Sequence, residues 1–139
     1  DGIRDYKVTG VQTCALPISM SIRAIRGATQ VEANSEESIA EGTRELISAL
    51  FEANDLGAES VISILFTATA DLTAAFPAAS VRSLGLEDTP LICAVEIDVP
   101  GALPRTIRAM VHVESAKAKG EISHIYLHGA KVLRRDIAQ

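Results

Sequence analysis

The sequence predicts an α/β domain built on a mixed sheet of about five strands with two helices. Short apolar and β-branched stretches recur between Pro and Gly breaks, which is typical of strands. One longer segment among them repeats its apolar residues at helical spacing. A chain of 139 residues is the size of one domain, which leaves room for one hydrophobic core rather than two.

We place the single domain at residues 20–139 and exclude the first 19 residues from it. The string DGIRDYKVTGVQTCALPI, residues 1–18, resembles the conceptual translation of a sequencing-library adaptor, so that Met20 would be the first native residue. The string also lacks the sustained apolar run of a secretory signal peptide. We therefore expect residues 1–19 to be an artefactual, disordered leader that packs on nothing.

The first predicted elements are a strand at residues 21–31 and a helix at residues 34–54. The strand follows from alternating side chains before a glycine. For the helix, Asn34 is a suitable N-cap, and Glu37 three residues later completes a capping-box pattern. The helix has one apolar stripe and ends at an Asn-Asp-Leu-Gly sequence. The stripe consists of Ile39, Leu46, Ile47 and Leu50.

The next strand, residues 61–67, is almost continuously apolar, which predicts burial on both faces. Pro77 suits the first turn of a short second helix between residues 71 and 85. The long helix should cover one face of the sheet, and a homo-oligomer would cover the other. The remaining predicted strands are residues 91–99, 107–113 and 123–133, the last bent near Gly129.

The charge and hydropathy of the chain exclude two classes of partner. The net charge is −5, and the leader carries as many acids as bases. An acidic domain without a cluster of Lys and Arg is a poor nucleic-acid binder, so an anionic ligand would be attracted by a few focused arginines. Because no apolar run is long enough to span a bilayer, we expect a soluble protein without a membrane partner.

Cysteine and histidine usage predicts a cytoplasmic protein without a metal site. Cys14 lies in the leader, so Cys93 has no partner for an internal disulfide, which fits a reducing compartment. The three histidines, His112, His124 and His128, have no metal-ligand spacing. We interpret them as surface or hydrogen-bonded residues.

Polar residues in otherwise apolar strands are the candidate functional groups. Arg108 is costly to bury without an anionic partner, although a strand-edge ion pair would also explain it. Glu96 is harder to explain structurally, whereas Cys93 alone would be a small core residue. Strand periodicity puts Cys93 and Glu96 on opposite faces unless a bulge intervenes. Tyr126 is either an ordinary strand aromatic or a phenol donor to a ligand.

The order and spacing of these residues resemble the small trimeric, non-helical chorismate mutases of Bacillus type. The resemblance covers residues 20–136 and implies a homotrimeric pseudo α/β barrel with active sites between subunits. It implies an isomerase that converts chorismate to prephenate in phenylalanine and tyrosine biosynthesis. This rearrangement is pericyclic and needs positioning and charge stabilisation rather than a nucleophile–base pair or a cofactor. The motifs are Arg26-Gly27-Ala28-Thr29, Phe76-Pro77-Ala78, Arg82, Cys93-x-x-Glu96, Arg108 and Tyr126.

The family resemblance also implies a role for each candidate residue. Three are catalytic: Arg108 would face the ether oxygen and a carboxylate of chorismate, Glu96 would accept from the substrate hydroxyl, and Cys93 would also reach the ligand. Five others would bind the substrate. Arg26 and Tyr126 would bind its carboxylates, Phe76 and Leu133 would form apolar walls, and Arg82 would be a basic residue at the pocket mouth.

Two alternatives remain open at this point. A related trimeric scaffold could serve as a metabolite-binding module or an imine-hydrolysing enzyme, because a fold alone does not fix a function. Those scaffolds lack the combination of Cys93, Glu96, Arg108 and Tyr126. A scaffold that has lost catalysis is the other alternative, because Ala79 stands where the family often has a lysine.

Overall fold

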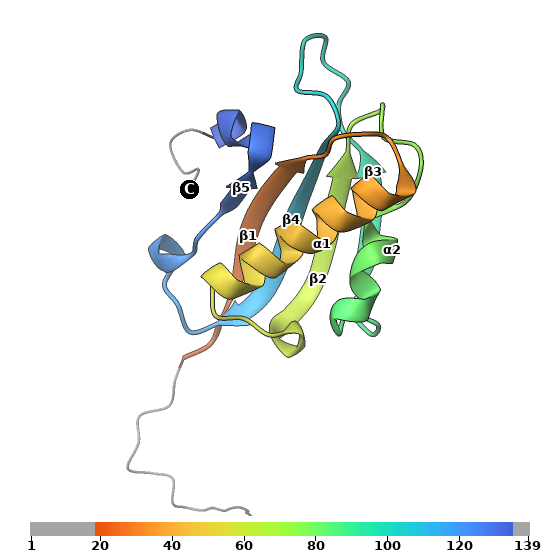
Figure 1. The fold of residues 1–139 in the computed structure, drawn as a ribbon. Coiled ribbons are helices and arrows are strands. Elements are labelled where there is room, and N and C mark those ends of the chain that lie inside the picture. The colour runs from red at the N-terminus through yellow and green to blue at the C-terminus, as the bar shows by residue number, and fades with distance from the viewer. Residues whose placement is uncertain (1–18, 135–139) are drawn as a thin grey trace, which may run out of the picture.

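The computed structural model describes residues 19–134. The expectation that residues 1–19 pack on nothing falls outside this range, apart from Ser19, which is exposed. Within the described range, a five-stranded sheet carries both α-helices on one face (Figure 1). This arrangement confirms the predicted α/β class.

The sheet is mixed, as the sequence predicted. The strand order is β3-β2-β4-β1-β5. The central strand β4 runs antiparallel to both of its neighbours, and each edge strand runs parallel to the strand beside it. The strands are β1 (Ser21–Gln30), β2 (Val61–Ala68), β3 (Leu91–Val95), β4 (Thr106–Ser115) and β5 (Ile125–Leu127).

The long helix α1 (Glu36–Ala53) forms where the apolar stripe predicted it. All four stripe residues are fully buried, and they pack on the sheet (Figure 1). The Cβ of an alanine at position 27 would lie 3.0 Å from Leu46 Cδ1, so Gly27 allows α1 to approach β1 closely. The glycine of the Arg-Gly-Ala-Thr motif therefore has a packing role.

The predicted cap of α1 is wrong by one residue. Ser35 is the N-cap, and its hydroxyl accepts a hydrogen bond from the backbone N–H of Ser38 over 3.1 Å. Asn34 is instead committed to a distant loop, where its Oδ1 accepts from the backbone N–H groups of Thr73 and Ala74. Both residue types can cap a helix, and this long-range contact decides between them.

The short second helix α2 (Pro77–Val81) confirms the second predicted helix, with Pro77 in its first turn. It continues into a 3₁₀ turn over Arg82–Leu84. The turn ends at Gly85, which adopts a φ of 88°, a left-handed conformation that glycine adopts without strain. The buried residues of α2 pack into the same core as α1.

Two predicted strands are shorter than expected. The strand predicted at residues 91–99 ends at Val95, and the following backbone continues to the turn at Gly101. The strand predicted at residues 123–133 covers only β5, because His128 takes a φ of 53° and the chain then forms a 3₁₀ helix over His128–Arg134. A positive φ cannot continue a strand, so periodicity over this segment overestimated its length.

The sheet face opposite α1, which we call the open face, keeps large apolar side chains exposed. Ile22 is 66% exposed, Ile92 62% and Leu65 39%. The prediction that β2 is buried on both faces is therefore wrong for a single chain, since α1 covers only one of them. The 3₁₀ helix His128–Arg134 and Leu103 cover the open face near β5 alone.

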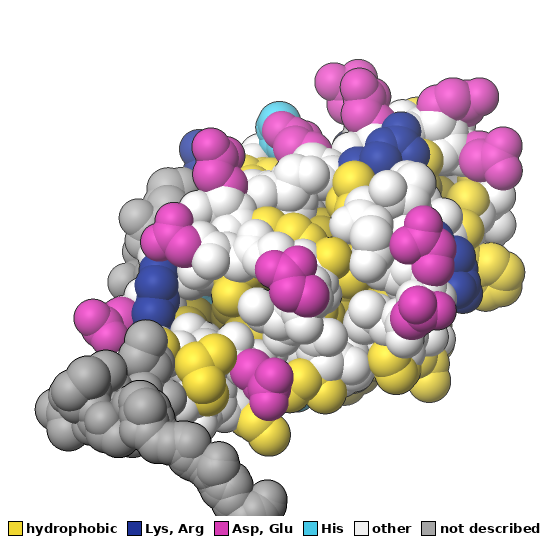
Figure 2. Space-filling view, turned by 90° about the horizontal axis from the view of Figure 1, so that it is seen from below, with side chains coloured by type: hydrophobic (Ala, Val, Ile, Leu, Met, Phe, Trp, Pro, Cys, Tyr) yellow, Lys and Arg dark blue, Asp and Glu magenta, His cyan; other side chains and the backbone are white. Residues whose placement is uncertain are grey.

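Charged side chains are dispersed rather than clustered on the face seen from below (Figure 2). In the view from below, acidic side chains are distributed over the molecule, whereas the basic ones are isolated from one another (Figure 2). This pattern agrees with the net charge of −5. No helix among residues 19–134 has the length and apolar character that a membrane span requires.

Candidate active site

One row of residues crosses the open face and defines the candidate site. In the strand registers, Thr67 on β2 lies opposite Arg108 on β4, Arg108 opposite Ala28 on β1, and Ala28 opposite Tyr126 on β5. Neighbouring strands are about 4.8 Å apart, so Arg108 and Tyr126 are separated by about 10 Å at the backbone. This spacing suits a small ligand lying across the sheet.

Arg108 and Glu96 form an ion pair at one end of this row. Arg108 Nε lies 2.7 Å from Glu96 Oε2, with the side chains 33% and 24% exposed. The Nε–H is not directed at that oxygen, so the contact is an ion pair without a hydrogen bond. Thr67 Oγ1 donates to the same oxygen over 3.3 Å. The anionic partner predicted for Arg108 is thus present in the same chain.

Glu96 reaches the open face because it follows β3 directly. Its backbone N–H still donates to the carbonyl of Ala68 over 2.9 Å, so the strand geometry extends to this residue. Strand alternation then turns Ile92 and Glu96 to the open face and Cys93 to the helix-covered face. No bulge occurs between Cys93 and Glu96, and the register β2–β3 is continuous. The single chain does not bring these two predicted catalytic residues together.

Tyr126 occupies the other end of the row and is only 1% exposed. It packs with Ala28 and Ala130, and Leu133 packs against this cluster. The phenol oxygen has no hydrogen-bond partner among the described residues. A buried hydroxyl without a partner is costly, and a ligand acceptor would satisfy it. Arg26 is half-buried two residues before Ala28, on the same face of β1.

Phe76 and Cys93 line a different cleft, of about 700 Å³, between α2 and the β3 edge. Phe76 is 74% exposed, and Cys93 is partly buried against the core. Arg82 is exposed just beyond the end of α2. The structure therefore divides the eight predicted site residues into two groups. The open-face group is Arg26, Glu96, Arg108, Tyr126 and Leu133. The second group, which we call the cleft group, is Phe76 and Cys93, which line the cleft, and Arg82, which lies outside its lining, beyond the end of α2.

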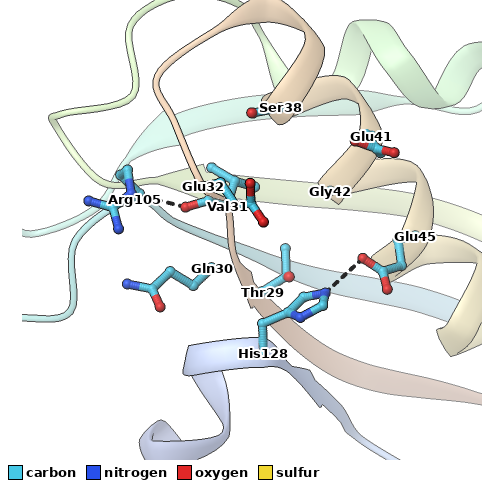
Figure 3. A pocket seen from close by; sticks show the side chains of 10 residues that line it. All are labelled: Thr29, Gln30, Val31, Glu32, Ser38, Glu41, Gly42, Glu45, Arg105 and His128. Carbon is cyan, nitrogen blue, oxygen red and sulfur yellow. Dashed lines mark hydrogen bonds and ion pairs between the residues drawn. The ribbon is translucent and has the colours of Figure 1, made fainter.

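A third hollow, of about 590 Å³, lies between α1 and the end of β1 (Figure 3). Glu32, Glu41 and Glu45 line it, and His128 Nε2 lies 3.0 Å from Glu45 Oε1. These three carboxylates outnumber the single guanidinium of the lining, that of Arg105, so the hollow would repel a dicarboxylate ligand. The hollow contains none of the eight predicted residues, so we do not assign the substrate to it.

Two residues of the open face were missed by sequence reasoning. Thr67 contacts Glu96, and His124 Nδ1 accepts the backbone N–H of Arg26 over 3.0 Å. Burial, followed by the charges of Arg26 and Arg134, lowers the pKa of His124 below the ordinary 6.5. Only the strand pairing reveals these contacts, because the partners are 29 and 98 residues apart in the sequence.

Comparison with known proteins identifies the family. The family model described as chorismate mutase type I matches residues 22–137. The chain belongs to the type I chorismate mutase family. It is 41% identical to chorismate mutase AroH of Thermus thermophilus over 117 residues. This match covers 84% of this chain and 96% of that protein. It is 42% identical over 120 residues to chorismate mutase AroH of Bacillus subtilis, with coverages of 86% and 94%.

A solved structure extends the likeness to the fold. A chorismate mutase from Clostridium thermocellum superimposes with a TM-score of 0.77 at 50% sequence identity, covering 78% of this chain and 97% of that one. Family membership favours the chorismate mutase interpretation over the metabolite-binding and imine-hydrolysing alternatives. The resemblance drawn from the sequence motifs is confirmed at the level of the family.

Proposed function

We propose that the open-face group of one subunit and the cleft group of a neighbouring subunit together form the active site of a homotrimer. The reaction is that of the family: the chain is an isomerase that converts chorismate to prephenate. We place it in the cytoplasm, in the biosynthesis of phenylalanine and tyrosine.

The observation that carries this proposal is the separation of the two groups within one chain. Cys93 packs against the helix-covered core and lines the cleft with Phe76, whereas Arg108 and Tyr126 belong to the row on the open face. The open face also exposes Ile22, Leu65 and Ile92, which a second copy would bury. Docking a cleft group onto an open face would complete the set of charges and apolar walls around one ligand.

The chemistry requires no proton transfer and no covalent intermediate. Breaking the ether bond of chorismate places negative charge on the ether oxygen, and the guanidinium of Arg108 is positioned to stabilise it. Arg26 and Tyr126 supply donors for the substrate carboxylates, and a guanidinium binds a carboxylate in two-point fashion. Glu96 orients Arg108 and accepts from the substrate hydroxyl. Catalysis then consists of positioning and preorganised charge.

The cleft group supplies the other half of the pocket. Phe76 would pack on the substrate ring as an apolar wall, facing Leu133 across the ligand. Arg82 adds a cation at the mouth, which attracts a dianion to an otherwise acidic protein. Ala79 provides no cation where relatives often have a lysine, so we expect weaker substrate capture with little change in the chemical step.

The test uses a chain that begins at Met20 and measures the loss of chorismate from its ultraviolet absorbance. We expect Arg108→Ala to fold normally and to lower kcat by at least about 10²-fold, the scale of removing one preorganised charge contact. Arg108→Lys should also be impaired, because an ammonium cannot reproduce the planar fork.

The matched control is Arg44→Ala, which removes an exposed arginine from α1 and should leave kcat unchanged. Near-normal turnover in Arg108→Ala would remove Arg108 from its assigned role. No turnover by a folded, oligomeric wild type would instead overturn the chorismate mutase activity.

A further inference from the structure

The imidazole of His124 takes the place of a backbone acceptor at the start of the β1–β5 pair. Ile125 is the first residue of β5 and lies opposite Gly27 in parallel register. One position earlier, the backbone N–H of Arg26 donates to Nδ1 of His124 over 3.0 Å. A ladder N–H ordinarily donates to a carbonyl oxygen. The side chain therefore extends this edge pairing by one position.

We propose that His124 is a positioning residue that holds Arg26 and Tyr126 in register for substrate binding, an inference that rests on the proposed function of this site. Arg26 carries the amide that His124 binds, and Tyr126 follows His124 by two residues. Movement of the short strand β5 would shift the phenol relative to the guanidinium. Because Arg26 and Tyr126 are the proposed donors to the substrate carboxylates, such a shift would weaken substrate binding.

This role requires a neutral imidazole. Nδ1 accepts a hydrogen bond only while it is unprotonated, whereas both nitrogens of the imidazolium are donors. The charged groups that act on the ring are Arg26 from β1 and Arg134 from the C-terminal 3₁₀ helix. Together with burial, which is the larger effect, they lower the pKa of His124 below 6.5. The surroundings thus keep His124 neutral, and able to accept, at more acidic pH than an ordinary histidine.

Two variants of matched shape separate the acceptor from the packing. Asparagine carries Oδ1 on Cγ where histidine carries Nδ1, so His124→Asn keeps an acceptor. Leucine has the same branching without one. Near neutral pH we expect His124→Asn to keep the KM for chorismate within about twofold, and His124→Leu to raise it about tenfold with a smaller change in kcat, the scale of one lost hydrogen bond. Sedimentation checks that both variants assemble as the wild type does.

The pH profile provides a readout that a purely structural role would not change. In the wild type, kcat/KM should fall at acid pH as His124 gains a proton and releases the Arg26 amide. In His124→Asn this component of the fall should be absent, because asparagine does not titrate. A wild-type KM in His124→Leu, or an unchanged acid limb in His124→Asn, would overturn the inference.

Amide hydrogen exchange at Arg26 tests the same contact without activity. The Arg26 amide should be protected in the wild type and in His124→Asn, and should exchange about tenfold faster or more in His124→Leu. If the wild type failed to turn over chorismate, the proposed function would fail while this measurement still decided the role of the hydrogen bond. Full protection of Arg26 in His124→Leu would show that His124 does not hold β1.

Discussion

At the scale of single residues, the candidate site differs from an ordinary sheet surface by its unsatisfied polar groups. Among residues 19–134, the buried Tyr126 hydroxyl has no hydrogen-bond partner, and the buried Nε–H of Arg108 is not directed at the neighbouring Glu96 carboxylate. Each arrangement costs free energy in the folded chain. Folding alone therefore does not account for the buried Tyr126 hydroxyl, whereas a carboxylate of the proposed substrate would accept its hydrogen bond.

The variant Tyr126→Phe separates the effect of the Tyr126 hydroxyl on stability from its effect on substrate binding. Removing an unpartnered hydroxyl should leave stability unchanged or raise it by about 1 kcal/mol, because no hydrogen bond is lost. The KM for chorismate should rise about tenfold, since the phenol is the proposed carboxylate donor. Urea unfolding and steady-state kinetics on the same preparation measure both. A loss of stability equal to that of Tyr126→Ala would mean that the hydroxyl has a structural partner.

The lowered pKa of His124 predicts how stability depends on pH. Burial, Arg26 and Arg134 favour the neutral ring, so the folded chain binds this proton less readily than the unfolded chain. The contribution is fully present above the unfolded value of about 6.5 and is lost as pH falls from there through the lowered folded value. The unfolding midpoint of the wild type should therefore fall more over this range than that of His124→Asn. Parallel pH dependence in the two proteins would contradict this prediction.

At the scale of elements, the sequence predicted what local pattern controls and failed where distant contacts decide. The stripe of α1 fixed the helix and its buried face, and Pro77 correctly indicated the start of α2. The N-cap was wrong because a loop 39 residues away takes the side chain of Asn34. The two-residue repeat of a strand correctly predicted that Cys93 and Glu96 lie on opposite faces of the sheet. By contrast, no local signal could reveal Thr67 or His124, whose contacts depend on the strand order.

The two candidate caps of α1 should respond differently to removal. Ser35→Ala deletes the hydroxyl that accepts from Ser38 and should cost about 1 kcal/mol of stability, with kcat unchanged. Asn34→Ala deletes contacts to Thr73 and Ala74 instead, so its effect should fall on the loop that leads to Phe76. Thermal unfolding measures the first effect and the KM for chorismate the second. Equal changes in KM for Ser35→Ala and Asn34→Ala would show that the two side chains do not have these separate roles.

At the scale of the whole molecule, the proposed site residues fall into two groups that lie apart within one chain. Arg108, Glu96 and Tyr126 are on the open face, while Phe76 and Cys93 line the cleft beside α2. Because α1 covers only one face of the sheet, Leu65 of β2 stays 39% exposed on the open face of a single chain. The same exposed surface therefore accounts for the expected assembly and for the division of the site.

Mixing two defective variants tests this division directly. Arg108→Ala damages only the open-face group, and Arg82→Glu reverses a charge in the cleft group. When equal amounts of the two variants assemble at random, each group of a given site has an even chance of being intact, so about one quarter of all sites should contain both intact groups. Co-refolding the two variants should then restore turnover well above that of either alone.

The control mixture pairs Arg108→Ala with Glu96→Gln, two defects in the same group. Every site then contains one damaged open face whichever subunits combine, so no turnover should be regained. Mass spectrometry under native conditions verifies that both mixtures contain hybrid oligomers. Equal recovery in the two mixtures would contradict the pairing of the two groups across subunits. Recovery in the first mixture alone requires that Arg108 and Arg82 meet from different subunits, the arrangement that the exposed face of the sheet permits.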